Sequence, residues 1–119
     1  MKTHELLSTY PIAGKIIIDH YKETLRGGAN LSPELEEFLT DEVVISAASG
    51  TLDKNPRAIL DLLDNHGIHA TLVITYVNHN PIFTVDINGA VSETFFDKRY
   101  DAEVYLLENA VEMLNNKIG

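Results

Sequence analysis

The chain has 119 residues and a formal net charge of −9, with 45% hydrophobic and 23% charged residues. This length suits one domain with a single core, and the balance of residue types is ordinary for a folded protein. The absence of cysteine excludes disulfide bonds, thiolate zinc sites and thiol catalysis. No apolar run approaches the roughly 18 residues that a membrane-spanning helix requires. Residues 1–5 lack the layout of a signal peptide, so we expect a cytoplasmic protein without membrane association.

The negative charge is spread over both halves of the chain. Residues 1–54 hold five basic and nine acidic side chains (−4), and residues 55–119 hold four basic and nine acidic side chains (−5). Affinity for nucleic acid comes largely from Lys and Arg side chains that neutralise phosphates, and neither half is rich in them. An acidic surface favours basic partners. The composition therefore predicts another protein, rather than nucleic acid, as the partner.

The N-terminal half, residues 1–54, reads as helical. Tyr10-Pro11 begins the first predicted helix, since proline is tolerated at the first helical position, and Gly27 ends it. Between them, apolar residues recur at helical spacing, at positions 12, 16, 17, 21 and 25. Ser32 is the predicted N-cap of a second helix that opens with Pro33. A further helix capped by Thr40 is one interpretation of residues 43–50, and a strand through the β-branched run at 43–45 is the other.

The C-terminal half alternates between helix and strand patterns. Asn55-Pro56 predicts a helix over residues 56–66 that Gly67 ends. Alternation of apolar and polar residues then predicts strands at 68–77, 82–88 and 90–96. A turn is expected at 78–81, and Asn88-Gly89 is a strong signal for a two-residue hairpin.

The closing helix is predicted near residues 100–116. Its apolar stripe runs through Ala102, Leu106, Ala110 and Met113. Three antiparallel strands need a cover on one face, and this helix is the expected cover. The sequence thus predicts a single α+β domain over residues 1–119. Its helical N-terminal half packs on an α-β-β-β-α unit with a three-stranded antiparallel sheet.

Residues 55–117 resemble the double-stranded RNA-binding domain. The matching features are Asn55-Pro56, the His79-x-Pro81-x-Phe83 motif at the second strand, the Asn88-Gly89 turn, and Lys98-Arg99 before the last helix. The resemblance implies the helix–three strands–helix order and a surface that spans two minor grooves of an RNA duplex. It also implies that His79, Lys98 and Arg99 lie on that surface.

The chain departs from the family pattern where RNA would be bound. The family's lysine cluster is reduced to Lys98-Arg99, which Tyr100 follows and three carboxylates surround, those of Asp97, Asp101 and Glu103. The basic pair is offset by one residue from the family spacing. The loop ahead of the histidine has Tyr-Val-Asn at 76–78 in place of Gly-Pro, and the first helix bears acidic residues at 61 and 64. Each carboxylate near a phosphate is repulsive, so the charges argue against RNA.

Other chemistry has little support in the sequence. His66, His69 and His79 are the only histidine grouping in this half, but Gly67 ends the helix between the first two and no third metal ligand is indicated. Ser46 and Ser49 lack a glycine-framed nucleophile turn. We therefore expect no catalytic residue, no metal and no cofactor.

Two functions stay open. The favoured one is a small non-catalytic acidic interaction module, a protein-binding regulator or inhibitor of the kind found among phage and mobile-element products. The alternative is a weak binder of double-stranded nucleic acid through a reduced surface. The binding residues expected are His79, Lys98, Arg99 and Tyr100. A homodimer is also open, since Phe95-Phe96 would make the third strand an exposed apolar edge.

Overall fold

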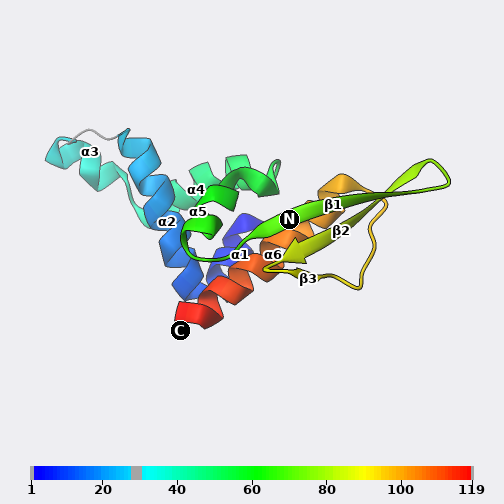
Figure 1. Cartoon of the computed structure of the whole chain (residues 1–119). Coiled ribbons are helices and arrows are strands. Elements are labelled where there is room, and N and C mark those ends of the chain that lie inside the picture. The colour runs from blue at the N-terminus through cyan, green and yellow to red at the C-terminus, as the bar shows by residue number, and fades with distance from the viewer. Residues whose placement is uncertain (1, 28–30, 119) are drawn as a thin grey trace.

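The last helix, α6 (Arg99–Ile118), is the element on which both halves of the molecule pack. The computed structural model describes residues 2–27 and 31–118. Helix α2 lies against α6 from the N-terminal half, and strands β1 and β2 lie against it from the C-terminal half (Figure 1). The fold is α+β, as the sequence predicts. The remaining elements are α1 (Thr3–Thr9), α2 (Pro11–Arg26), α3 (Pro33–Phe38), α4 (Asp41–Leu52), η1 (Pro56–Ile59), α5 (Leu60–Asn65), β1 (Ala70–Val77), β2 (Asn80–Ile87) and β3 (Ala90–Val91).

The first two helices meet at a close backbone approach. A Cβ placed on Gly14 of α2 would lie 2.5 Å from the carbonyl oxygen of Leu7 in α1, so only glycine fits there. Pro11 opens α2 and the left-handed Gly27 (φ 63°) closes it, which confirms both predicted boundaries. Helix α1 was not predicted, because its seven residues are too few to show a clear periodicity.

The predicted caps of α3 and α4 are present. The hydroxyl of Ser32 accepts a hydrogen bond from the Leu35 N–H, and that of Thr40 accepts one from the Val43 N–H. Residues 43–50 are helical, so the strand interpretation of this segment is wrong. The reason is the four-residue spacing of Val44, Ala48 and Leu52, all of which α4 buries completely.

The segment predicted as one helix over 56–66 is divided in two. Its first turn is the 3₁₀ helix η1, and the regular helix α5 follows it. The side chain of Asn55 makes no capping hydrogen bond, so the expected N-cap is absent. Ile59 and Leu63 are nevertheless buried four residues apart, and Gly67 closes the segment with a φ of 78°.

The sheet has the strand order β1-β2-β3 and is antiparallel throughout. Strands β1 and β2 form a hairpin in which Ala70 pairs with Ile87 and Val77 with Asn80. Its turn is two residues, Asn78-His79, with φ of 51° and 68°, so β2 begins two residues earlier than predicted. The turn at Asn88-Gly89 also has two positive φ angles, 53° and 89°, as a type I′ turn requires.

The third strand is shorter than the predicted 90–96. Only Ala90–Val91 pairs regularly with β2, and Phe96 then returns to pair with Phe83 after a shift of two residues in register. Ser92 marks the break. Its N–H still donates to the Val85 carbonyl, but the Val85 N–H donates to the Ser92 hydroxyl in place of a backbone carbonyl, and this hydroxyl donates to the Thr94 carbonyl. The prediction of a third strand over residues 90–96 is therefore wrong.

The core lies between α6, the base of the sheet and the N-terminal helices. Fully buried side chains of α6 line its length, those of Ala102, Leu107, Ala110, Val111 and Leu114. Met113, placed in the predicted stripe, is 37% exposed instead. The molecule measures 58 × 28 × 24 Å, and α3 and the β1–β2 turn lie at opposite ends (Figure 1). Within 2–27 and 31–118, no helix has the length and apolar character needed to cross a membrane.

Candidate functional site

The four residues predicted to bind a partner fall in two places. His79 lies in the turn that ends the β1–β2 hairpin, where its positive φ places it at the tip. Lys98, Arg99 and Tyr100 lie at the start of α6 (Figure 1). The hairpin projects beyond α6, so the predicted set does not form one surface around His79. Each place has its own chemistry.

The projecting half of the hairpin is apolar and exposed. Side chains of Ile74 and Tyr76 point to the face that α6 covers at the hairpin's base, but here they are 42% and 70% exposed. Val77 is exposed as well. They are exposed because β1 is too long for α6 to cover: its alternation of apolar residues continues past the point where α6 begins. No Asp, Glu, Lys or Arg occurs from position 70 to position 85.

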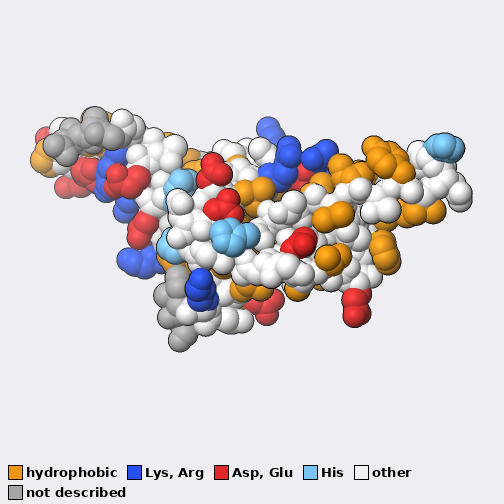
Figure 2. All heavy atoms as spheres, in the orientation of Figure 1, with side chains coloured by type: hydrophobic (Ala, Val, Ile, Leu, Met, Phe, Trp, Pro, Cys, Tyr) orange, Lys and Arg blue, Asp and Glu red, His pale blue; other side chains and the backbone are white. Residues whose placement is uncertain are grey.

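A second apolar group lies beside the hairpin. Phe96 pairs with Phe83, and its ring lies 5.2 Å from that of Tyr105 in α6. Phe95, the preceding residue, is 70% exposed. Hydrophobic side chains gather over the hairpin and the segment next to it in Figure 2. We call Ile74, Tyr76, Val77 and Phe95 the hairpin surface.

The start of α6 holds a compact group of charges. Glu103 is 6% exposed, and one of its oxygens lies 3.0 Å from Nε of Arg99 and 3.1 Å from Nε of Arg57. The two arginines therefore share a buried carboxylate. Lys54 and Lys98 are exposed and close to them in the chain, and Figure 2 shows Lys and Arg side chains side by side in the middle of this face. We call Lys54, Arg57, Lys98 and Arg99 the basic group.

Tyr100 has a structural partner in the N-terminal half. Its hydroxyl donates a hydrogen bond to the carbonyl oxygen of Asp53. The carboxylate of Asp53 in turn accepts from the N–H of Thr3, 2.9 Å away, and from the Thr3 hydroxyl. Asp53 thus accepts hydrogen bonds from the first turn of α1 through its carboxylate and from Tyr100 through its carbonyl oxygen. The tyrosine predicted to bind a partner joins α6 to the helices before it.

A groove of about 750 Å³ runs between α6 and the strand β3 side of the sheet. It exists because β3 stops after two residues and leaves this flank of α6 uncovered. Its apolar lining includes Val91, Tyr105 and Met113, and Glu112 and Lys117 lie at its polar end. The sequence did not indicate this groove, because it results from the shortening of the third strand.

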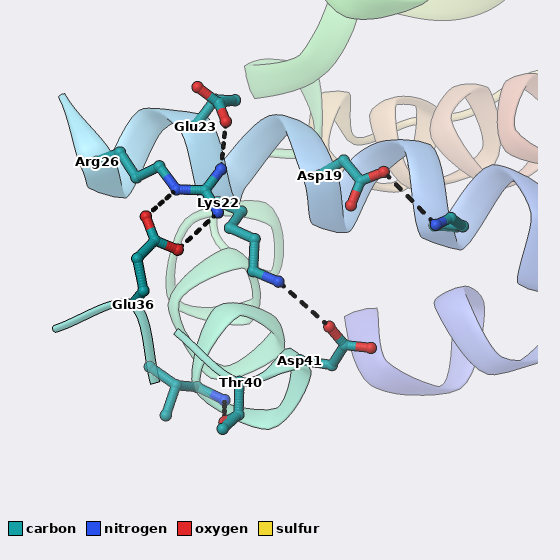
Figure 3. A network of polar contacts seen from close by, with 9 residues as sticks. Asp19, Lys22, Glu23, Arg26, Glu36, Thr40 and Asp41 are labelled. Carbon is teal, nitrogen blue, oxygen red and sulfur yellow. Dashed lines mark hydrogen bonds and ion pairs between the residues drawn. The ribbon is translucent and has the colours of Figure 1, made fainter. Parts of the chain in front are cut away.

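At the opposite end of the molecule, ion pairs join α2 to α3 and α4 (Figure 3). The guanidinium of Arg26 in α2 donates two hydrogen bonds to the carboxylate of Glu36 in α3, at 2.8 and 2.9 Å, and a third to Glu23. Lys22 lies 3.9 Å from Asp41, which ties α2 to the start of α4. The bonds to Glu36 and Glu23 raise the pKa of Arg26. The bond from Arg26 lowers the pKa of Glu36 below its ordinary value.

The histidines do not assemble a metal site. His69 Nδ1 lies 3.0 Å from the Asp64 carboxylate, and His66 contributes its carbonyl to Lys117. Across the described ranges, 2–27 and 31–118, no group of three His, Cys, Asp or Glu side chains is placed to hold a metal ion.

Sequence reasoning missed part of the basic group. The spacing of Arg99 and Glu103, four residues apart on a helix, does signal their ion pair. Arg57 gives no such signal, since it reaches Glu103 only through the tertiary fold. The sequence places Glu103 among the carboxylates that oppose the basic pair, and in the structure it is buried between two arginines.

Comparison with known proteins adds no relative. No family model matches the chain, and neither a curated protein nor a solved structure matches it.

Proposed function

We propose that this protein is a small non-catalytic interaction module that binds another protein through the hairpin surface. The observation that carries the proposal is the exposure of Tyr76, on the uncharged projecting half of the hairpin, and of Phe95, in the segment beside it, each 70%. Aromatic side chains supply much of the energy of protein interfaces when they enter a partner's pocket. Several large apolar side chains exposed on one projecting part of a molecule often mark an interaction site.

The partner surface is expected to be apolar at its centre and basic at its rim. Residues 70–85 of the hairpin bear no charged side chain, while the chain as a whole carries −9. A basic rim would be steered toward the protein by long-range attraction and would raise the association rate. The module acts as a regulator or inhibitor, because its exposed apolar surface is suited to holding a partner.

The test is a pull-down from a native lysate with three forms of the full chain: the parent, Tyr76→Lys and Phe38→Lys. Phe38 is equally exposed, at 71%, but lies in α3 at the opposite end, so it is a matched control. We expect a protein that the parent and Phe38→Lys retain and Tyr76→Lys loses. Retention by all three forms would contradict the hairpin surface as the site.

The second candidate is weak binding of duplex nucleic acid, and the basic group favours it. Four of the nine Lys and Arg residues belong to this group, and the order of α5, β1, β2, β3 and α6 is the one that the resemblance to double-stranded RNA-binding domains implies. Glu103 opposes this function, since it neutralises part of the charge of Arg57 and Arg99. Few phosphate contacts remain, and binding built on few contacts fades as salt rises.

An RNA-duplex titration separates the two candidates. We expect no micromolar binding by the parent at roughly physiological ionic strength. Micromolar binding that the double change Lys98→Ala/Arg99→Ala abolishes would establish the nucleic-acid function. Phe38→Lys is the control for a general gain of one positive charge, and it should not bind the RNA duplex either.

A further inference from the structure

The outer edge of β1 is open along its length. Strand β1 is at the end of the sheet order and pairs only with β2. Its residues from Val73 to Val77 are exposed. Helices α5 and α6 also contact β1. Within the described ranges, the backbone of 70–77 makes no hydrogen bond outside the β1–β2 ladder.

The alternation of the ladder identifies the backbone groups at that edge. A two-residue turn makes Val77 and Asn80 a hydrogen-bonded pair, so odd-numbered residues of β1 direct their N–H and C=O groups toward β2. The hydrogen bond from the Asn88 N–H to the His69 carbonyl fits the same alternation. The outward groups therefore belong to four even-numbered residues, Ala70, Leu72, Ile74 and Tyr76.

This edge lacks the features that keep strands from pairing with other chains. Natural edge strands are usually short, bulged, covered, or interrupted by charge or proline. Strand β1 has eight residues, no charge and no proline, and consists largely of Val, Ile, Thr and Tyr. The other edge of the sheet is protected, because β3 has two residues and Ser92 breaks its ladder.

We propose that β1 pairs antiparallel with β1 of a second copy of this chain, so that two three-stranded sheets form one six-stranded sheet around a two-fold axis. The occupant is a second copy because an uncharged strand can lie beside itself without opposing like charges, despite the charge of −9. Among the described strands of each copy, only β1 offers a long open edge, so the pairing closes as a dimer and does not propagate.

The two-fold symmetry also fixes the register. An axis perpendicular to the sheet keeps even-numbered side chains of both copies on one face, so even-numbered residues must pair with even-numbered ones. Among such registers, the one with Val73 on the axis pairs all four outward-facing residues, 70, 72, 74 and 76. It pairs Leu72 with Ile74 and Ala70 with Tyr76 of the second copy. The helical body of each copy then lies beside the hairpin turn of the other.

This dimer does not depend on the proposed function, since the hydrogen bonds of the β1 backbone edge form it, although Ile74 and Tyr76 of the hairpin surface lie beside the second copy. Sedimentation equilibrium of the full chain over micromolar to near-millimolar concentrations tests it. We expect a monomer–dimer equilibrium for the parent and for the control Phe38→Lys. Val73→Lys and Val73→Glu should each weaken the dimer by at least about tenfold, because like charges would then face each other across the axis.

Mixing Val73→Lys with Val73→Glu should restore a heterodimer, because opposite charges then meet on the axis. Circular dichroism of each variant separates loss of pairing from loss of folding. Amide hydrogen exchange is a second readout that needs no substitution. Protection of Leu72, Ile74 and Tyr76 should rise with protein concentration, whereas that of Val73 and Thr75 should not. A parent that stays monomeric, or folded variants that do not form the heterodimer, would overturn the proposal.

Discussion

The two ends of this elongated molecule are stabilised in opposite ways. At one end, α3 buries none of its residues and is tied to α2 by the bidentate pair of Arg26 and Glu36. At the other, eight residue pairs join β1 to β2, and the exposed side chains of the hairpin include the apolar Ile74, Tyr76 and Val77. Phe38 and Tyr76, one at each end, are almost equally exposed. Exposure alone therefore does not distinguish a binding surface from a peripheral helix.

The difference lies in how each end is anchored. Exposed ion pairs contribute little to stability and weaken with salt, so α3 can separate from the body at small cost. The hairpin is anchored by Phe83 and Val85, whose side chains are buried against α6. A rigid projecting element can present apolar side chains in a fixed geometry, which favours binding. The hairpin has that rigidity and α3 does not.

Phe83→Ala should have the largest effect of the changes that we predict. The side chain is buried, and its residue pairs with both Ile74 and Phe96, so its removal leaves a cavity where the hairpin joins the core. We expect a loss of about 3–5 kcal/mol in the free energy of unfolding, measured by urea denaturation. Phe95→Ala is the matched control and should change it by less than about 0.5 kcal/mol. Equal losses would show that the hairpin is not anchored at Phe83.

Gly89→Val should have the next largest effect on stability. Residue 89 has a φ of 89°, which a β-branched residue adopts only under strain. We expect a loss of roughly 1–3 kcal/mol in thermal unfolding experiments. An unchanged melting temperature would be evidence against the type I′ turn that joins β2 to β3.

Gly50→Ala should raise the free energy of unfolding, whereas the two preceding changes should lower it. Gly50 lies in α4, and a Cβ there would meet no atom within 4 Å. Alanine should stabilise the helix by about 0.5–1 kcal/mol, because glycine loses more backbone freedom on folding. A destabilised variant would mean that this part of α4 packs against something in solution.

Acid should release α3 while the hairpin stays intact, and this is the smallest effect. The pKa of Glu36 is lowered by Arg26, so the contribution of their contact is present above the ordinary glutamate pKa and is lost as the pH falls through the lower, folded value. Below about pH 4, the protection factors of the α3 amides, which correct for the intrinsic pH dependence of exchange, should therefore fall. Glu36→Gln should show fast exchange in α3 already at neutral pH. Hairpin amides that respond in the same way would erase the contrast between the two ends.

Local signals in the sequence predicted most of the fold correctly. The caps at Ser32 and Thr40, the helix start at Pro11 and the Asn88-Gly89 turn depend on residues within a few positions of each other. The failures have distant or competing causes. Helix α1 depends on Asp53, fifty residues away in sequence, which receives the N–H of Thr3. The third strand ends early because Ser92 offers its backbone neighbours a local hydrogen bond.

The candidate site was less accessible to sequence reasoning than the fold. Lys98 and Arg99 do lie at the entrance of α6, but His79 lies at the hairpin tip, and spacing along the chain cannot show that separation. Arg57 joins the basic group through Glu103, a contact between residues 46 positions apart in the sequence. Tyr76 is typical of a strand facing the core, and only the position at which α6 begins determines that it is exposed.

The position of α6 in the chain has a consequence for synthesis on the ribosome. Both α2 and β2 pack on α6, yet it is the last of the described elements to be translated, at about 5–20 residues per second. A nascent chain that has not reached residue 99 holds the hairpin with no helix beneath it and an unpaired β1 edge. The core therefore closes only after these final residues emerge. A ribosome stalled just before them would display an apolar chain that chaperones should bind.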